Sequence, residues 1–156
     1  MVFRQPLAAS ILVALLAAAP AAWADDPVKD VIDAEVPALK DGTKIALNDV
    51  QDAILAACKR RGFDATVAAP GLVTARWTHG KHTFDVTIPF SDTLYSIRYL
   101  DSAYMDYNPK KNRIDDAYNE YVAALSEHIE ADFERALKRL KVAQKMAQKQ
   151  ARTAAN

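Results

Sequence analysis

The chain has 156 residues, of which 51% are hydrophobic, and its 20 Lys and Arg balance 20 Asp and Glu. This length suits one domain, and the composition excludes collagen-like proteins, coiled-coil arrays and disulfide scaffolds. The balanced charge gives no overall signal for nucleic acid, so no nucleic-acid partner is expected. Cys58 is the single cysteine, which rules out an internal disulfide.

Residues 1–24 have the pattern of a secretory signal peptide. Arg4 provides a positive start, residues 7–20 form an apolar run too short to span a bilayer, and Ala-Trp-Ala at 22–24 fits a cleavage site. We therefore expect a periplasmic mature chain that begins at Asp25 and has no transmembrane helix.

Residues 25–46 carry six acids and three bases, and they are interrupted by Pro27, Pro37 and Gly42. Turn-forming residues at these intervals predict an irregular lead-in with little regular structure.

A first helix is expected from Leu47. Asn48 is suited to cap it, Gln51 stands three residues further on, and Gly62 follows three basic residues as a stop signal. The apolar stripe of this helix consists of Leu47, Val50, Ile54, Ala57 and Cys58.

Residues 63–101 alternate between polar residues and β-branched or aromatic ones, which predicts a meander of four strands. The strands expected are 63–68, 72–79, 82–88 and 94–101. A two-residue hairpin at Gly80-Lys81 places His79 opposite His82.

The two remaining connections, at 69–71 and 89–94, are chosen so that apolar residues share one face of the sheet. The apolar rows are Phe63, Trp77, Phe84 and Tyr99; Ala65, Ala75, Val86 and Ile97; and Val67, Val73, Ile88 and Tyr95. The opposite face has the alternating charge row Asp64, Arg76, Asp85 and Arg98. Strands 63–68 and 94–101 are then exposed edges that could accept a partner strand.

A second, longer helix is predicted by apolar residues at helical spacing after a polar loop at 101–113. These residues are Ile114, Ala117, Tyr118, Tyr121, Val122, Leu125, Ile129 and Phe133. Both helices need an apolar partner, so residues 47–137 are expected to form an α+β two-layer sandwich of order α-β-β-β-β-α, with both helices on one face of the sheet.

Residues 138–156 form a basic helical extension. It contains six cations and no acid, namely Lys138, Arg139, Lys141, Lys145, Lys149 and Arg152. Such a segment can make weak contact with a membrane surface or pair with an acidic partner, while a solvated helix end is the simpler interpretation.

Tyrosines in the loop after the last strand suggest a contact surface. Tyr104, Tyr107 and Asn108, together with Tyr118 and Asn119, could form a shallow ligand-binding or partner-binding surface. The alternative is that Tyr104 and Tyr107 cover the open end of the core.

The sequence gives weaker support to two further functions, metal binding and catalysis. His79 and His82 could hold a metal ion, but they fall short of the usual three or four ligands. No nucleophile motif or acid/base pair is present, so no catalytic residue and no cofactor are assigned.

The strand-loop-helix part of the chain resembles small uncharacterised exported proteins of Gram-negative bacteria. The resemblance covers about residues 47–130. It rests on Tyr95-Ser96-Ile97-Arg98-Tyr99, Asp101-Ser102, Tyr107, Ile114 and Tyr118-Asn119-x-x-Val122-x-x-Leu125. It implies a helix, an antiparallel meander and a second helix, and it implies no activity.

Together these features predict a non-enzymatic periplasmic interaction module that binds another envelope protein. The alternative is a small-ligand or metal-binding protein of the cell envelope.

Overall fold

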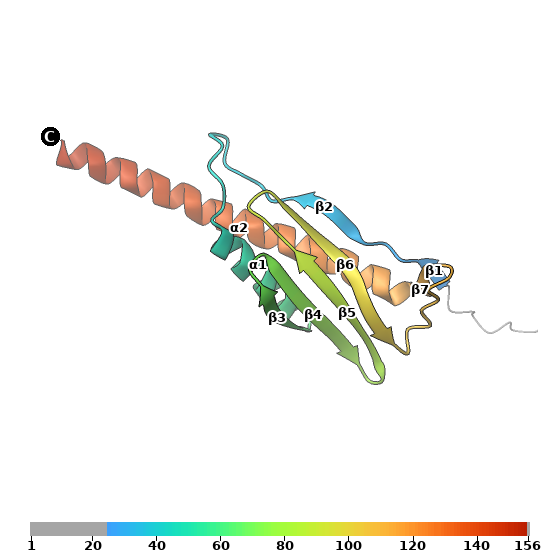
Figure 1. Cartoon of the computed structure of the whole chain (residues 1–156). Coiled ribbons are helices and arrows are strands. Elements are labelled where there is room, and N and C mark those ends of the chain that lie inside the picture. Colours follow the sequence, from blue (N-terminus) through green and yellow to red (C-terminus); the bar gives the residue numbers. More distant parts are fainter. Residues whose placement is uncertain (1–24, 156) are drawn as a thin grey trace, which may run out of the picture.

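The computed structural model describes residues 25–155, so the expected signal peptide lies outside the described part of the chain. The elements in chain order are β1 (Asp25–Pro27), β2 (Val31–Glu35), α1 (Leu47–Arg60), β3 (Phe63–Ala69), β4 (Leu72–His79), β5 (His82–Pro89), β6 (Leu94–Ala103), β7 (Arg113–Asp115) and α2 (Asp116–Ala154). The protein is thus α+β, with two helices and antiparallel strands, and both helices lie on the same side of the main sheet (Figure 1).

The main sheet has five strands in the order β2-β6-β5-β4-β3, so the expectation of four was wrong. The fifth strand comes from the lead-in, where Val31 pairs with Ile97 and Ala34 with Tyr95. Asp33 between them has a φ of 51° and interrupts the ladder, which explains why no strand pattern was visible. Strand β6 is consequently covered by β2, and the strand edges of this sheet are β2 and β3.

The lead-in is also held by side chains, which corrects the expectation of an irregular segment. The Asp30 carboxylate accepts a hydrogen bond from the backbone N–H of Tyr99 at 2.9 Å and another from the hydroxyl of Tyr118 at 3.2 Å. A separate ladder joins β1 to β7, with Asp26 opposite Ile114. Contacts this distant in sequence leave no local signal, which is why composition alone suggested a loop.

The registers of the first two hairpins are confirmed. Phe63 pairs with Trp77 across β3 and β4, and His79 pairs with His82 across the two-residue turn between β4 and β5. The two-residue turn at Gly80-Lys81 therefore sets the side-chain orientation along β4 and β5, as expected for this type of hairpin.

The register expected between β5 and β6 was wrong by two residues, because Val86 pairs with Tyr99 and not with Ile97. The connecting turn is tighter than expected, with Phe90 bridged to Tyr95 and the Ser91 hydroxyl accepting hydrogen bonds from two backbone N–H groups of the turn. A shift of two keeps the side chains of β6 up to Tyr99 on the expected face, so Tyr95 and Ile97 are still buried. Val67 on β3, which was expected in an apolar row, is 45% exposed, so its place in the core was predicted wrongly.

A bulge between Asp85 and Val86 changes the charge row on the open face. Asp101, and not Arg98, lies opposite Asp85, while Arg98 pairs with Thr87. The row is therefore Asp64, Arg76, Asp85 and Asp101, with three acids and one base.

Helix α1 begins two residues earlier than a cap at Asn48 would require. Ala46 is the cap position and no side chain caps it, so Asn48 lies within the first turn. Leu47 is exposed, which removes it from the expected apolar stripe. The buried residues are Val50, Ala53, Ile54, Ala57 and Cys58.

The core lies between the helices and the sheet face that the alternation predicted. Phe84 is fully buried, and its ring centroid lies 5.0 Å from that of Tyr118 on α2 and 5.3 Å from that of Trp77 on β4. Tyr95 and Phe133 make a similar edge-on contact at 5.5 Å. Aromatic pairs in these geometries add about 1 kcal/mol each to the burial of apolar area.

A buried carboxylate joins the two helices. Asp132 on α2, only 6% exposed, forms ion pairs with Arg60 at the end of α1 and with Arg135 on its own helix. No pattern in the sequence singles out Asp132, because its partner Arg60 is 72 residues away.

Gly71 provides a test of the turn between β3 and β4. Its φ is +77°, and a Cβ there would lie 3.1 Å from the Phe90 carbonyl oxygen, whereas Gly80 at φ +59° has open space. We expect Gly71→Ala to lower the free energy of unfolding by about 2 kcal/mol and Gly80→Ala by about 1 kcal/mol. Urea denaturation measures the free energy of unfolding of both variants. Equal losses would contradict the close approach of Gly71 to the Phe90 carbonyl oxygen.

Asp30 provides a test of how the lead-in is held. Asp30→Ala leaves the buried Tyr118 hydroxyl without its acceptor, so we expect a loss of about 2 kcal/mol in the free energy of unfolding. Asp30→Asn keeps an acceptor oxygen and should lose less than half as much in the same thermal or urea titration. If the two variants are equally stable, the hydrogen bonds of Asp30 do not hold the lead-in.

Candidate interaction surfaces

The second half of α2 extends past the rest of the molecule (Figure 1). Leu137 is its last buried residue, and from Lys141 to Ala154 every residue except Gln144 is exposed. Gln144 donates a hydrogen bond to the Thr43 hydroxyl at 3.1 Å. Two sizeable apolar side chains in this part remain in solvent, Val142 at 55% and Met146 at 60% exposure.

The six cations expected in the extension are all present on this exposed helix. Among the described residues, none of them has an ion-pair partner. The cations are Lys138, Arg139, Lys141, Lys145, Lys149 and Arg152. They form an unneutralised basic surface at the end of the molecule where α2 projects.

The tyrosine loop is divided between the core and the surface. Tyr107 is half-buried and its ring contacts that of Tyr99 in a tilted arrangement with a centroid distance of 4.4 Å, while Met105 in the same loop is buried. Tyr104 points outward at 66% exposure, with the Lys81 ammonium 5.3 Å from its ring centroid. Tyr107 thus covers the core, and Tyr104 is the exposed tyrosine of this loop.

The other residues expected at that surface have structural contacts. Tyr118 is fully buried, and burial raises the pKa of its hydroxyl. Asn119 accepts a hydrogen bond from the Lys29 N–H at 2.9 Å and donates one to the Pro27 carbonyl at 3.0 Å. Asn108 accepts hydrogen bonds from two backbone N–H groups within its own loop. These residues do not form one open surface with Tyr104.

The two hairpin histidines are neighbours, as the turn predicted. His79 is exposed and stacks on Trp77, with ring centroids 5.9 Å apart. The described residues contain no group of three or more His, Cys, Asp or Glu side chains placed to hold a metal ion.

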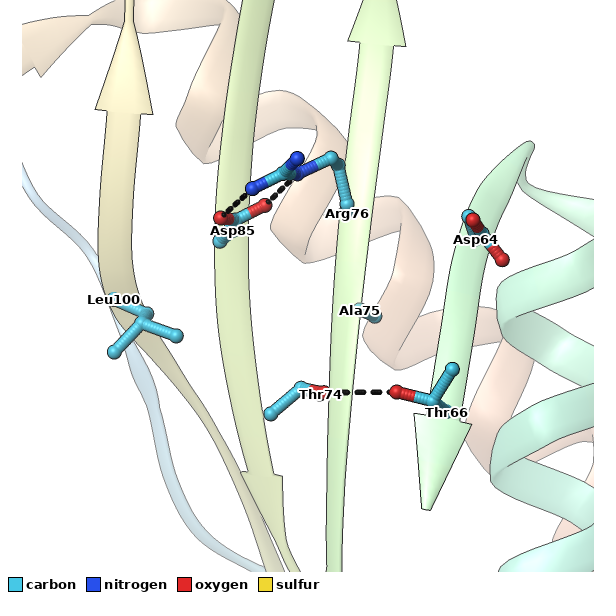
Figure 2. Close-up of a pocket in the computed structure, with 7 residues that line it drawn as sticks. All are labelled: Asp64, Thr66, Thr74, Ala75, Arg76, Asp85 and Leu100. Carbon is cyan, nitrogen blue, oxygen red and sulfur yellow. Dashed lines mark hydrogen bonds and ion pairs between the residues drawn. The ribbon is translucent and has the colours of Figure 1, made fainter. Parts of the chain in front are cut away.

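A shallow hollow of about 310 Å³ lies on the open face of the sheet, lined by Asp64, Thr66, Thr74, Ala75, Arg76, Asp85 and Leu100 (Figure 2). Arg76 donates two hydrogen bonds of 2.7 Å to Asp85, which raises the pKa of the guanidinium, and the hydroxyls of Thr66 and Thr74 are 3.1 Å apart. Arg76 and Asp85 are already hydrogen-bonded to each other, and so are the hydroxyls of Thr66 and Thr74. A ligand that bound to these groups would have to break the existing hydrogen bonds.

Cys58 lies on the buried face of α1 and is fully inaccessible. Burial raises the pKa of its thiol to about 12, so the thiolate is absent near neutral pH. A cysteine nucleophile is therefore not available in the folded protein.

This burial predicts slow modification of Cys58. We expect an aromatic disulfide reagent at pH 8 to leave the native protein unmodified over minutes and to react at once after unfolding in guanidinium chloride. The absorbance of the released thiolate measures both reactions. Immediate reaction without denaturant would show that the thiol is accessible and the core assignment of α1 is wrong.

Within residues 25–155, neither helix combines the length and apolar character needed to cross a membrane. In comparisons with family models, with curated proteins and with solved structures, nothing matches this chain.

Proposed function

We propose that the protein is a non-enzymatic interaction module of the bacterial periplasm and that it binds through the projecting part of α2, residues 138–154. The observation that carries this proposal is a helix exposed on nearly all sides that has six cations without ion-pair partners among the described residues. The periplasmic location rests on the signal-peptide pattern of residues 1–24.

The projecting segment lacks the contacts that normally support a helix. Isolated helices shorter than about 12–15 residues are marginal in water, and most helices in proteins depend on packing of one face. Among the described residues from Lys141 onward, Gln144 is the one whose side chain hydrogen-bonds to another part of the protein, and Ala143 lies beside Ile45. Contact with a partner would provide the missing packing and would cover Val142 and Met146.

The alternative function, binding of a small ligand or metal in the cell envelope, has less support. His79 and His82 are adjacent but have no third ligand among the described residues. The hollow beside Arg76 is open, and four of its polar side chains pair with each other, Arg76 with Asp85 and Thr66 with Thr74.

A photo-crosslinking amino acid at Gln148 tests the proposal in the host cell. Gln148 is exposed and lies among the cations of α2, and Thr78, exposed on β4, is the matched control position. We expect a discrete adduct from position 148 that is absent from position 78 and that weakens when Lys145 and Lys149 are both changed to Glu. A result in which neither position gives an adduct would overturn the proposal.

A further inference from the structure

Charge is separated along the outward side of α2. Residues 116–134 contain six Asp and Glu and no Lys or Arg, whereas residues 135–152 contain seven Lys and Arg and no Asp or Glu. The change of sign occurs between Glu134 and Arg135, near the middle of the helix.

Most of these charges lie on one line, which we call the outward ridge. At about 100° per residue they share a sector about 100° wide on the side away from the buried residues Val122 and Ile129. Glu130 lies at the edge of this sector, where its carboxylate accepts a hydrogen bond of 3.4 Å from the Tyr95 hydroxyl. The acidic half of the outward ridge is Glu120, Glu127, Glu130 and Glu134, and the basic half is Lys138, Lys141, Lys145, Lys149 and Arg152. All nine side chains are exposed.

Forces within a single helix do not explain this separation. The helix dipole acts on charges in the first and last turns only, and Lys138 and Lys141 are several turns from the end of α2 at Ala154. Like charges four residues apart destabilise a helix, and the ridge contains three such pairs: Glu130 with Glu134, Lys141 with Lys145, and Lys145 with Lys149. The isolated chain therefore bears a cost that a complementary partner would remove.

The complementary surface is present on the chain itself. When a second α2 runs antiparallel to the first about a two-fold axis between Glu134 and Arg135, the position opposite residue i is about 269 minus i. Glu120 then lies near Lys149, Glu127 near Lys141, and Glu130 near Lys138. Because a two-fold axis repeats each contact, every such pair occurs twice.

We propose that two copies of this protein pair through antiparallel outward ridges, so that the basic half of each α2 lies on the acidic half of the other. The inference rests on the proposed function and names the partner as a second copy. In this arrangement each projecting segment gains the support that it lacks in the single chain. Ala123 and Ala131, which are exposed within the acidic half, leave room for close approach of the helices.

An anionic membrane surface fits this ridge less well than a second copy does. A helix lying on such a surface with its cations downward would also turn Glu120 and Glu127 toward the lipid headgroups. The side opposite the cations consists mainly of Ala143, Ala147 and Ala151, which bury little apolar area.

Charge exchange tests the proposal with the purified protein by sedimentation velocity. We expect a dimer at low salt whose dissociation constant rises about tenfold or more in about 0.5 M salt, because salt screens exposed pairs. The double variants Lys141→Glu/Lys149→Glu and Glu120→Lys/Glu127→Lys should each be monomeric. Mixed in equal amounts they should form a heterodimer, and all four changes in one chain should restore the homodimer.

A matched control distinguishes an effect of the outward ridge from an effect of the total charge of the protein. Lys81→Glu/Arg98→Glu changes the net charge as much as the first double variant does, at exposed sites on the main sheet away from α2, and should leave the dimer intact. Circular dichroism of every variant checks that the fold is retained.

Three results would overturn the inference: a wild-type protein that stays monomeric at low salt, a dimer that the double variants do not disrupt, or double variants whose mixture stays monomeric. A monomer that binds vesicles containing phosphatidylglycerol would assign the basic half to lipid. If crosslinks at Gln148 persist in cells with a mass other than twice that of the chain, the interaction function stands and self-pairing fails.

Discussion

The structure depends on a mismatch of length between α2 and the sheet on which it packs. Helix α2 has 39 residues and spans about 58 Å, whereas β6, the longest strand, has 10 residues and spans about 33 Å. Only the part of α2 from Tyr118 to Leu137 can bury an apolar stripe against the sheet face. The C-terminal remainder projects, and near that point the sequence of the helix changes from acidic to basic.

The two ends of α2 consequently have different structural roles. Near its beginning, Tyr118 and Asn119 hold the lead-in, through Asp30 and through the backbone around Pro27, and so support the fifth strand of the sheet. At its end, α2 has almost no contact with the rest of the chain. One continuous helix therefore joins a well-packed domain to an exposed charged surface, which is the arrangement expected of a module that binds by a helix face.

Local geometry explains which parts of the sheet were predictable. A two-residue turn allows few registers, so the pairing of His79 with His82 and the rows across β4 and β5 could be derived from Gly80. The register between β3 and β4 followed from placing apolar residues on one face. A longer connection allows several registers on the same face, and the tight turn held by Ser91 selected another one. The bulge next to Asp85 has no sequence signature, so the position of Asp101 in the charge row could not be foreseen.

By itself, the sequence determined most of the residues that face the core and the course of the long helix, because these features follow from periods of two and 3.6 residues. The change of charge sign along that helix is also read directly from the residues. Only the tertiary structure decided that the lead-in forms a strand, that Tyr118 is buried while Tyr104 is exposed, and that Asp132 joins the two helices. These outcomes depend on pairs of residues tens of positions apart. Contacts of this kind leave no periodic pattern in the sequence, so they are seen only in the folded structure.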